Sequence, residues 1–265
     1  MKVSITIPTY NRSQYISQAI ESAINQSYKD IEIIVIDNCS TDNTEELVNH
    51  FQDKGVKYIK NHTNIGMMGN WNRCIEVSTG ELLMILGDDD ILYPNFIEES
   101  VSIFEKHPNI GFTFTHINKV DKDGKPLTKW GYKFTPAGLI KGRDYLLDTA
   151  KYSSCLTNSS SVLINKEVFK KIGIFEAPLS QNTFDFNMWI KIANSYDVYF
   201  IDKVLSDYRI HEEQVSEIHW RDKKRHTGKL GTYIELFQLA SYLLKKKEIR
   251  RDEKDYESII NQIAI

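Results

Sequence analysis

The sequence predicts an α/β fold in which helices flank a mostly parallel central sheet. Through the first hundred residues, short β-branched or aliphatic runs alternate with longer segments that have helical spacing. A repeated order of strand and helix indicates parallel strands joined by right-handed crossovers. The chain contains neither an internal repeat nor a low-complexity linker.

The first half of the chain contains four expected strands and four expected helices. Ser13 and Thr41 suit the N-caps of the first two helices, and Pro94 suits the first turn of the fourth. We expect the strands at 3–7, 31–36, 56–59 and 81–86, and the helices near 13–26, 42–53, 68–78 and 94–106.

The second half has a different pattern. The run IGFTFTHINKV and the turn DKDGK predict a hairpin, followed by a long loop that reaches Gly142. Beyond Ser216, an apolar stripe between Tyr233 and Leu244 precedes three lysines and predicts helices. Between these parts we expect helices near 142–150, 166–172 and 184–195, and strands near 160–164 and 198–205 on the same sheet.

Composition and charge exclude several classes of protein. The 265 residues are 41% hydrophobic and 26% charged, which is typical of a soluble globular protein. The net charge of -3 is uneven, because residues 221–254 hold 11 Lys/Arg against 5 Asp/Glu, a local +6 that leaves -9 for the rest. An acidic body argues against nucleic acid as a partner.

The cysteines and the start of the chain bear on its compartment. Cys39, Cys74 and Cys155 match no CxxC spacing and are odd in number, which favours a reducing compartment and no structural zinc. The opening run is soon broken by Pro8, unlike a signal peptide, and no apolar run approaches the roughly 20 residues that span a bilayer. We therefore expect a cytoplasmic protein.

Polar residues follow three of the four expected strands. They begin at Pro8, at Asp37 and at Gly87, and ligands bind at the carboxyl ends of strands in an open parallel sheet. The segment after Asp37 is equally suited to an Asx-turn and a helix N-cap. The glycine-rich loops GxGxxG and GxxxxGK[ST] are absent.

Three successive carboxylates, Asp88 to Asp90, follow the fourth strand. They repel one another and lose hydration after a buried strand, a cost that Mg²⁺ or Mn²⁺ with substrate phosphates relieves. A solvated helix-capping cluster is the alternative. The pattern favours a nucleoside diphosphate that is bound through a metal ion.

Six landmarks resemble glycosyltransferase family 2, a group of nucleotide-sugar transferases with the GT-A fold. The resemblance implies a catalytic domain over 1–215, in which 1–100 binds the nucleotide sugar and 101–215 the acceptor, and it leaves 216–265 as a helical extension. The landmarks cover 3–216 in the expected order: SITIPTYNR, IVIDNCSTDNT, NIGMMGNWNRCIEVSTGELLMILGDDDILYP, NSSSVLINKEVFKKIGIF, TFDFNMWIKIA and YRIHEEQVS.

The resemblance also implies a donor site. Asp37 would accept a hydrogen bond from the base, usually uracil, Asp88 would meet the ribose and Asp89 the metal. Gly87 stands where the family commonly has an acid, so the metal ligand among Asp88, Asp89 and Asp90 stays open, with Asp89 preferred. The other implied donor-site residues are Pro8, Thr9, Tyr10 and Arg12 around base and ribose, and Asn64, Gly66 and Asn72 near base and phosphate.

Asp185 is the implied catalytic base. The family places an acidic pair before a helix with Leu-Trp, and this chain keeps the second acid of that pair. A carboxylate that takes the acceptor's proton contributes ~10²- to 10⁴-fold, whereas the plain alternative is a first-turn acid that favours the helix dipole. His211 matches a family histidine near the diphosphate or metal, and is equally explained as an ordinary hydrogen-bonding residue.

These observations predict an inverting, non-processive glycosyltransferase. It would move a hexose or N-acetylhexosamine from a UDP-sugar to a hydroxyl of a saccharide or lipid-linked glycan acceptor, with Mn²⁺ or Mg²⁺. The processive motif QxxRW is absent. The alternatives are a sugar-nucleotide nucleotidyltransferase, whose triphosphate loop the sequence lacks, and an inactive nucleotide-sugar-binding module, which the single acid at Asp185 and the glycine at Gly87 leave open.

The basic C-terminal segment has two interpretations. Residues 216–265 either pack on the catalytic domain or on a twin subunit as a homodimer, or contact anionic lipid at the inner face of a membrane. Packing is the interpretation that needs no further partner.

Overall fold

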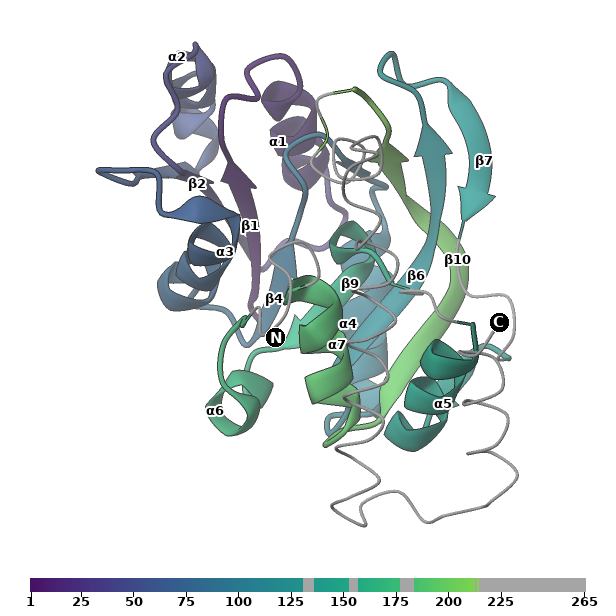
Figure 1. Ribbon diagram of the computed structural model, residues 1–265. Helices are drawn as coiled ribbons and strands as arrows, with labels where there is room; N and C mark the ends of the chain where they lie inside the picture. Colours follow the sequence, from purple (N-terminus) through teal and green to yellow (C-terminus); the bar gives the residue numbers. More distant parts are fainter. Residues whose placement is uncertain (131–135, 153–156, 177–183, 213, 215–265) are drawn as a thin grey trace, which may run out of the picture.

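The structure is a computed structural model with one twisted sheet at its centre, and helices cover both faces of that sheet (Figure 1). The α/β class expected from the alternating pattern is therefore confirmed. No helix in the described part of the chain is long and apolar enough to cross a bilayer. The expected helices of 216–265 lie outside the described residues, which are 1–130, 136–152, 157–176, 184–212 and 214.

The four strands expected in the first hundred residues are present and parallel. Neighbouring side chains such as Ile33 and Ile34 are both buried, because helices cover the sheet on both sides. This is why the strands appear in the sequence as continuous apolar runs. The strands are β1 (Val3–Thr9), β2 (Ile31–Asp37), β3 (Val56–Lys60) and β4 (Leu82–Ile85).

Three helices connect these strands: α1 (Ile16–Ile24), α2 (Thr44–Asn49) and α3 (Gly66–Val77). The segment expected as one helix over 42–53 divides into α2 and a 3-10 turn. Gly55 follows that turn with φ +84°, a conformation that glycine adopts without steric cost. The connections thus confirm the expected alternation, with one helix shorter than the sequence suggested.

Two helices begin later than expected. The N-caps are Tyr15 for α1 and Asn43 for α2, so the assignments to Ser13 and Thr41 are wrong. The carboxylate of Asp42 explains the difference for α1, because it accepts a hydrogen bond from the backbone N–H of Ser13 at 3.0 Å. The loops that precede the two helices are therefore held together at the same edge of the sheet.

The second half of the chain makes the sheet mixed. It contributes β5 (Ile91–Leu92), β6 (Phe112–Val120), β7 (Pro126–Trp130), β8 (Gly138–Ile140), β9 (Val162–Asn165) and β10 (Val198–Arg209). The expected hairpin is β6 with β7, and β9 lies antiparallel between β4 and β6. The sequence did not predict β5 and β8, since two or three residues show no periodicity.

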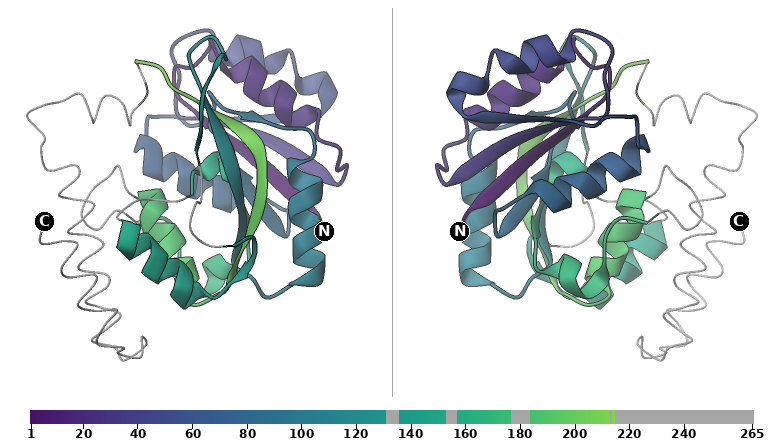
Figure 2. Two further views of the ribbon diagram at one scale, coloured as in Figure 1. Left: turned by 90° about the vertical axis from the view of Figure 1, so that its right-hand side faces the viewer. Right: turned by 90° about the vertical axis from the view of Figure 1, so that its left-hand side faces the viewer.

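The four remaining helices are α4 (Phe96–Lys106), α5 (Gly142–Tyr152), α6 (Val168–Ile172) and α7 (Phe184–Ala193). All four occupy segments expected to be helical, although α4 begins after Pro94 with Asn95 as its N-cap. Two cores result. One contains side chains of α1, α2 and α4, and the other contains side chains of α3, α5, α6 and α7 on the opposite face (Figure 2).

The strand order brings six carboxyl ends to one edge of the sheet. The order is β3-β2-β1-β4-β9-β6-β10-β5, with β7 beside β6 and β8 beside β10. Six strands run in the same direction, as their pairing shows: β1, β2, β3, β4, β6 and β10. The backbone N–H of Asn38 donates to the carbonyl of Thr9, and that of Leu86 to Thr6, so the loops after these strands start side by side.

A buried acid lies at the other end of the sheet. Glu32 is 7% exposed and accepts hydrogen bonds from the Ser4 hydroxyl at 2.6 Å, the Thr79 backbone N–H at 2.7 Å and the Lys57 ammonium at 3.0 Å. Burial alone would raise the pKa of Glu32, but these hydrogen bonds outweigh it and lower the pKa from 4.5 to about 2. The ionised carboxylate thus stabilises the folded state.

We expect Glu32→Gln to lower the free energy of unfolding by about 2 kcal/mol at pH 7, since it removes the charge from several hydrogen bonds. Because the folded-state pKa is depressed, this contribution is complete above pH 4.5 and is lost as the pH falls towards 2. Urea unfolding at pH 7 and pH 3.5 measures it. The difference in unfolding free energy between wild type and Glu32→Gln should be smaller at pH 3.5. Glu105→Gln, at an exposed position, is the control. An equal difference at both pH values would contradict the role assigned to Glu32.

Candidate active site

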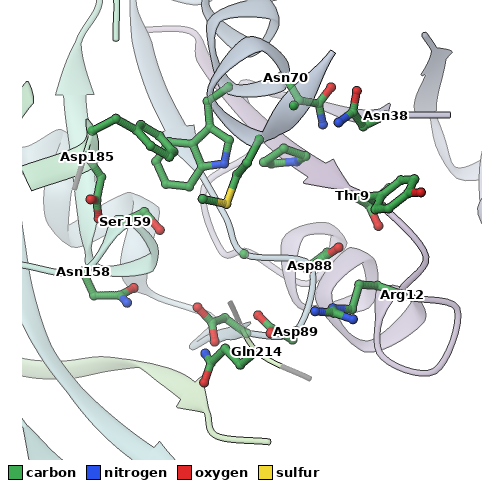
Figure 3. Close-up of a pocket in the computed structure, with 18 of the residues that line it drawn as sticks. Thr9, Arg12, Asn38, Asn70, Asp88, Asp89, Asn158, Ser159, Asp185 and Gln214 are labelled. Atoms are coloured by element: carbon green, nitrogen blue, oxygen red, sulfur yellow. The ribbon is translucent and has the colours of Figure 1, made fainter. Parts of the chain in front are cut away.

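A cavity of about 480 Å³ opens at the edge where the carboxyl ends meet. Its wall combines the loops after β1, β2 and β4 with the start of α3, the loop before β9 and the start of α7 (Figure 3). Nine residues expected at the site line this cavity: Pro8, Thr9, Tyr10, Arg12, Asn64, Gly66, Asp88, Asp89 and Asp185. The structure therefore brings together residues that lie as far as 177 positions apart in the chain.

One side of the cavity is built from hydrogen-bonded asparagines. Asn38 donates through Nδ2 to Asn64 Oδ1 at 2.8 Å, and its own Oδ1 accepts from Asn61 Nδ2 at 3.2 Å. Asn61 also donates to Asn70 Oδ1 at 2.9 Å, and Asn70 donates to the carbonyl of Ile36. These bonds fix the start of α3 against the end of β2, which makes this side of the cavity rigid.

Asp37 does not line the cavity, contrary to expectation. It is fully buried, and its two oxygens accept hydrogen bonds from the Ser40 backbone N–H at 2.8 Å and the Tyr58 hydroxyl at 2.5 Å. Asn38 lies on the cavity instead. The difference of one residue arises because consecutive residues at a strand end point in opposite directions.

Asn72 is also outside the cavity. Its side chain donates to the carbonyl of Phe175 at 3.0 Å and accepts from the backbone N–H of Phe175 at 2.9 Å, so it ties α3 to the segment after α6. Asn70 and Trp71 line the cavity in its place, together with Met67. These three positions share one face of α3 at spacings of three and four residues, which is the signal that could have identified them.

The three acids after β4 have different surroundings. Asp90 is 3% exposed, and its oxygens accept hydrogen bonds from the Ser160 hydroxyl at 2.5 Å and the Arg209 backbone N–H at 2.9 Å. All three acids line the cavity, but Asp88 and Asp89 are less buried than Asp90, and Arg12 lies beside Asp88 (Figure 3). The two hydrogen bonds of Asp90 hold the loop, whereas Asp88 and Asp89 are the more exposed acids.

The pKa values of Asp88 and Asp90 are raised above the ordinary value of an aspartic acid. Burial, followed by the charge of Asp89, raises the pKa of both Asp88 and Asp90. This is the cost that three adjacent carboxylates incur when no cation is bound. The acidic loop is thus electrostatically prepared for a positive charge.

His211 and Asp89 form a close pair. The Nε2 atom of His211 lies 2.8 Å from Asp89 Oδ2, while its Nδ1 is buried and has no hydrogen-bond partner in the described part of the chain. The ring packs on Tyr15, with 4.9 Å between the centroids. His211 does not line the cavity, so it reaches the site through Asp89.

Arg209 was not predicted as a site residue, although it lies in the same sequence motif as His211, YRIHEEQVS. Its side chain is buried and donates to the carbonyl of Asp89 at 2.8 Å, the carbonyl of Lys122 at 3.0 Å and Gln18 Oε1 at 2.8 Å. The guanidinium also lies 5.0 Å from the centre of the Tyr15 ring. Arg209 thus joins the acidic loop to α1 and to the β6–β7 turn.

Asp185 lies in the first turn of α7, on the far side of the cavity from Thr9 and Arg12 (Figure 3). Burial raises its pKa from 3.8 to about 6, although backbone N–H groups of the helix start oppose this. Asn158 and Ser159 lie near it on the same side. A half-buried acid with a pKa near neutrality can accept a proton at physiological pH.

A metal ion would need ligands beyond the side chains present. In the described residues no group of three or more His, Cys, Asp and Glu side chains is placed to hold one. Asp89 and His211 are nevertheless a carboxylate and an imidazole, which suit Mn²⁺. The donor set fits a divalent ion whose remaining ligands are substrate phosphates and water.

Solved structures show the class of fold. The chain superposes on S. aureus TarS 1-349 in complex with UDP with a TM-score of 0.69 at 17% identity, covering 100% of this chain and 71% of TarS. The mannosyltransferase PcManGT from Pyrobaculum calidifontis, in complex with GDP-Man and Mn²⁺, gives 0.59 at 13% identity, covering 99% of this chain and 79% of PcManGT. The fold is the GT-A fold of glycosyltransferases, as expected.

The sequence comparison gives the family. The profile of glycosyl transferase family 2 matches residues 4–173, and the chain belongs to that family. An uncharacterised glycosyltransferase of Rickettsia typhi is 32% identical over 81% of this chain and 65% of its own length. An uncharacterised glycosyltransferase of Methanocaldococcus jannaschii is 29% identical over 91% of this chain and 87% of its own length. The chain thus spans less than two thirds of the R. typhi relative, and 35% of a Rickettsia felis relative.

We expect Arg209→Met to lower the free energy of unfolding by about 3 kcal/mol, because it leaves buried carbonyl groups of the acidic loop and the β6–β7 turn without a donor. Lys203→Met is the matched control on the same strand. Lys203 is 54% exposed and pairs with Glu99, so its loss should cost about 0.5 kcal/mol. Urea unfolding of both variants measures the difference, and equal effects would show that Arg209 is not an anchor.

Proposed function

We propose that the protein is an inverting glycosyltransferase that moves a sugar from a UDP-sugar to a hydroxyl of a saccharide or glycoconjugate acceptor. The observation that carries the proposal is that Asp185 and the pair Asp88–Asp89 lie on different sides of one cavity. This separation leaves room for a transferred sugar between a bound diphosphate and an acceptor hydroxyl. Family membership and the UDP bound in TarS support it.

The nucleotide would lie on the asparagine side. Asn38, Asn64, Thr9, Tyr10 and Asp88 line the cavity. Asn38 and Asn64 would offer amide groups to a base, with Thr9 and Tyr10 on the same side, and Asp88 would meet a ribose hydroxyl. Asn38 replaces Asp37 as the residue we assign to the base, because Asp37 is buried. Gly66, which has φ +78° at the start of α3, lines this side as well.

Asp89 and His211 would hold Mn²⁺ or Mg²⁺ with the diphosphate. When bound, the ion neutralises the charge that develops on the leaving diphosphate. A catalytic requirement for the metal is part of the proposal. The GDP-Man and Mn²⁺ in PcManGT support it.

Asp185 would act as the general base. It takes the proton from the acceptor hydroxyl as that oxygen forms a bond to the anomeric carbon, and the bond from this carbon to the diphosphate breaks with its electron pair leaving on UDP. The acceptor approaches from the face opposite the diphosphate, so the anomeric configuration inverts. No covalent intermediate with the enzyme forms.

The first test measures UDP release from a panel of UDP-sugars with saccharide acceptors and Mn²⁺. Asp185→Asn should reduce kcat by ~10²- to 10⁴-fold with little effect on the KM of the donor, because the base acts after binding. Asp89→Asn should raise the Mn²⁺ concentration needed for half-maximal activity, because it removes a proposed ligand of the metal. The control is Asp144→Asn, an exposed acid in the first turn of α5 that is outside the cavity.

Three results would contradict the proposal. Undiminished activity in Asp185→Asn would remove the base assignment. Release of pyrophosphate from UTP and a sugar phosphate would instead identify a nucleotidyltransferase, whereas binding of UDP without consumption of any donor would identify an inactive binding module.

The second test is the dependence of kcat on pH. The base must be ionised, and the pKa of Asp185 is about 6, so kcat should fall about tenfold per pH unit below 6 and level off above it. The profile is measured with saturating donor and Mn²⁺ between pH 5 and 8. The absence of an inflection near pH 6 would contradict this role of Asp185. The same inflection in Asp185→Asn would also contradict it.

A further inference from the structure

An apolar wall with no role in the nucleotide site lies next to Asp185. It consists of Met67 and Trp71 from α3 and Phe184 from α7, all of which line the cavity. The Trp71 ring meets Phe184 edge to face, with centroids 4.9 Å apart at 90°, and Phe175 at 5.4 Å and 87°. Packing on two sides fixes the indole, while Met67 is 39% exposed.

Polar groups from another element lie near the same acid. Asn158 and Ser159 line the cavity from the loop before β9, where the 3-10 turn Ser159–Ser161 begins. Asn158 accepts from the Ser160 backbone N–H at 2.8 Å, and its own backbone N–H donates to the Ser161 hydroxyl at 3.2 Å. The turn is therefore held in a capping box.

The capping box leaves two groups available to a ligand. No hydrogen bond joins Asn158 Nδ2 or Ser159 Oγ to another residue in the described part of the chain. Both groups lie in the cavity wall near Asp185, away from Asn38 and Thr9 at the nucleotide side (Figure 3). A donor and a hydroxyl held in a rigid turn are the kind of polar group that fixes ligand orientation in an otherwise apolar pocket.

We propose that Trp71, with Met67 and Phe184, binds the apolar face of the transferred pyranose, while Asn158 and Ser159 hydrogen-bond its hydroxyl groups. This rests on the proposed function, because the sugar must lie between the diphosphate at Asp89 and the acceptor at Asp185. A pyranose has a face of C–H groups and a rim of hydroxyls. An aromatic wall and nearby polar groups complement that distribution.

The position of the wall indicates the donor sugar rather than the base or the acceptor. The base lies on the asparagine side, where Asn38 and Asn64 hold the end of β2 to the start of α3. The acceptor hydroxyl must reach Asp185 from the side away from the diphosphate. The Trp71 wall lies between these two places, since α3 carries both Asn70, at the nucleotide side, and Trp71, which touches Phe184 beside Asp185.

Calorimetry with the full chain and Mn²⁺ tests this, with UDP, UDP-glucose, UDP-galactose and UDP-N-acetylglucosamine as probes. For the UDP-sugar that wild type binds best, Trp71→Ala should weaken binding about tenfold and Ser159→Ala about three- to tenfold, the range of one aromatic contact or one hydrogen bond. The affinity for UDP should stay within twofold in both. Trp71→Phe retains an aromatic face and should recover part of the loss.

Ser159→Ala removes one hydroxyl and none of the hydrogen bonds of the capping box, so it keeps the test independent of any packing defect in Trp71→Ala. The sugar subsite would be overturned if the variants lost as much affinity for UDP as for the UDP-sugar, or if the UDP-sugar affinity were unchanged in both. It would also be overturned if the variants changed only the KM of the acceptor in the UDP-release assay. None of these results would affect the glycosyltransferase assignment. Failure of wild type to bind UDP and every UDP-sugar would overturn both proposals together.

Discussion

The site depends on the way one buried carboxylate holds three strand ends together. Asp90 follows β4, and it accepts hydrogen bonds from Ser160 ahead of β9 and from the backbone of Arg209 at the end of β10. The Ser160 hydroxyl also accepts the backbone N–H of Gly87 at 3.0 Å. The acidic loop therefore has little freedom, and the hydrogen bonds of Asp90 fix the positions of its neighbours Asp88 and Asp89 in the cavity wall.

This arrangement also joins the two halves of the chain at one site. The side of the cavity that we propose for the nucleotide is built from the loops after β1 and β2, whereas Arg209 and His211 come from the end of β10. Arg209 reaches Gln18 of α1, so the last strand is attached to the first helix. The acidic loop lies between them, and both halves fix its position.

Much of the fold could be predicted from the sequence, because strands buried on both faces leave long apolar runs and helices leave a period near 3.6. Two-residue β5 and three-residue β8 leave no such pattern, since they pair only where tertiary structure brings an edge to them. The strand-end rule found the acidic loop and the Pro8 loop. It could not tell that Asn38 rather than Asp37 lines the cavity, because the rule gives the end of a strand and not the side to which each residue there points.

The residues that sequence reasoning missed at the site share a physical reason. Trp71 and Asn158 are ordinary residue types in a helix and a loop, and their importance comes from what lies opposite them in space. Asn158 serves the turn before β9 through its carbonyl oxygen and faces the cavity with its amide nitrogen. One side chain thus completes a local turn and offers a donor to a ligand, and only the tertiary structure separates these two roles.

The acids of the cavity differ in their roles because their surroundings differ. Asp90 has two strong donors and holds the loop; Asp89 faces His211 and suits a cation; Asp185 stands apart at a helix start, where burial raises its pKa to about 6. Two carboxylates at one point would share a proton, but an acid apart from the acidic loop can take one from a substrate independently. In the proposed reaction, the cavity would separate the place where negative charge is neutralised from the place where a proton is accepted, as a displacement at a carbon between them requires.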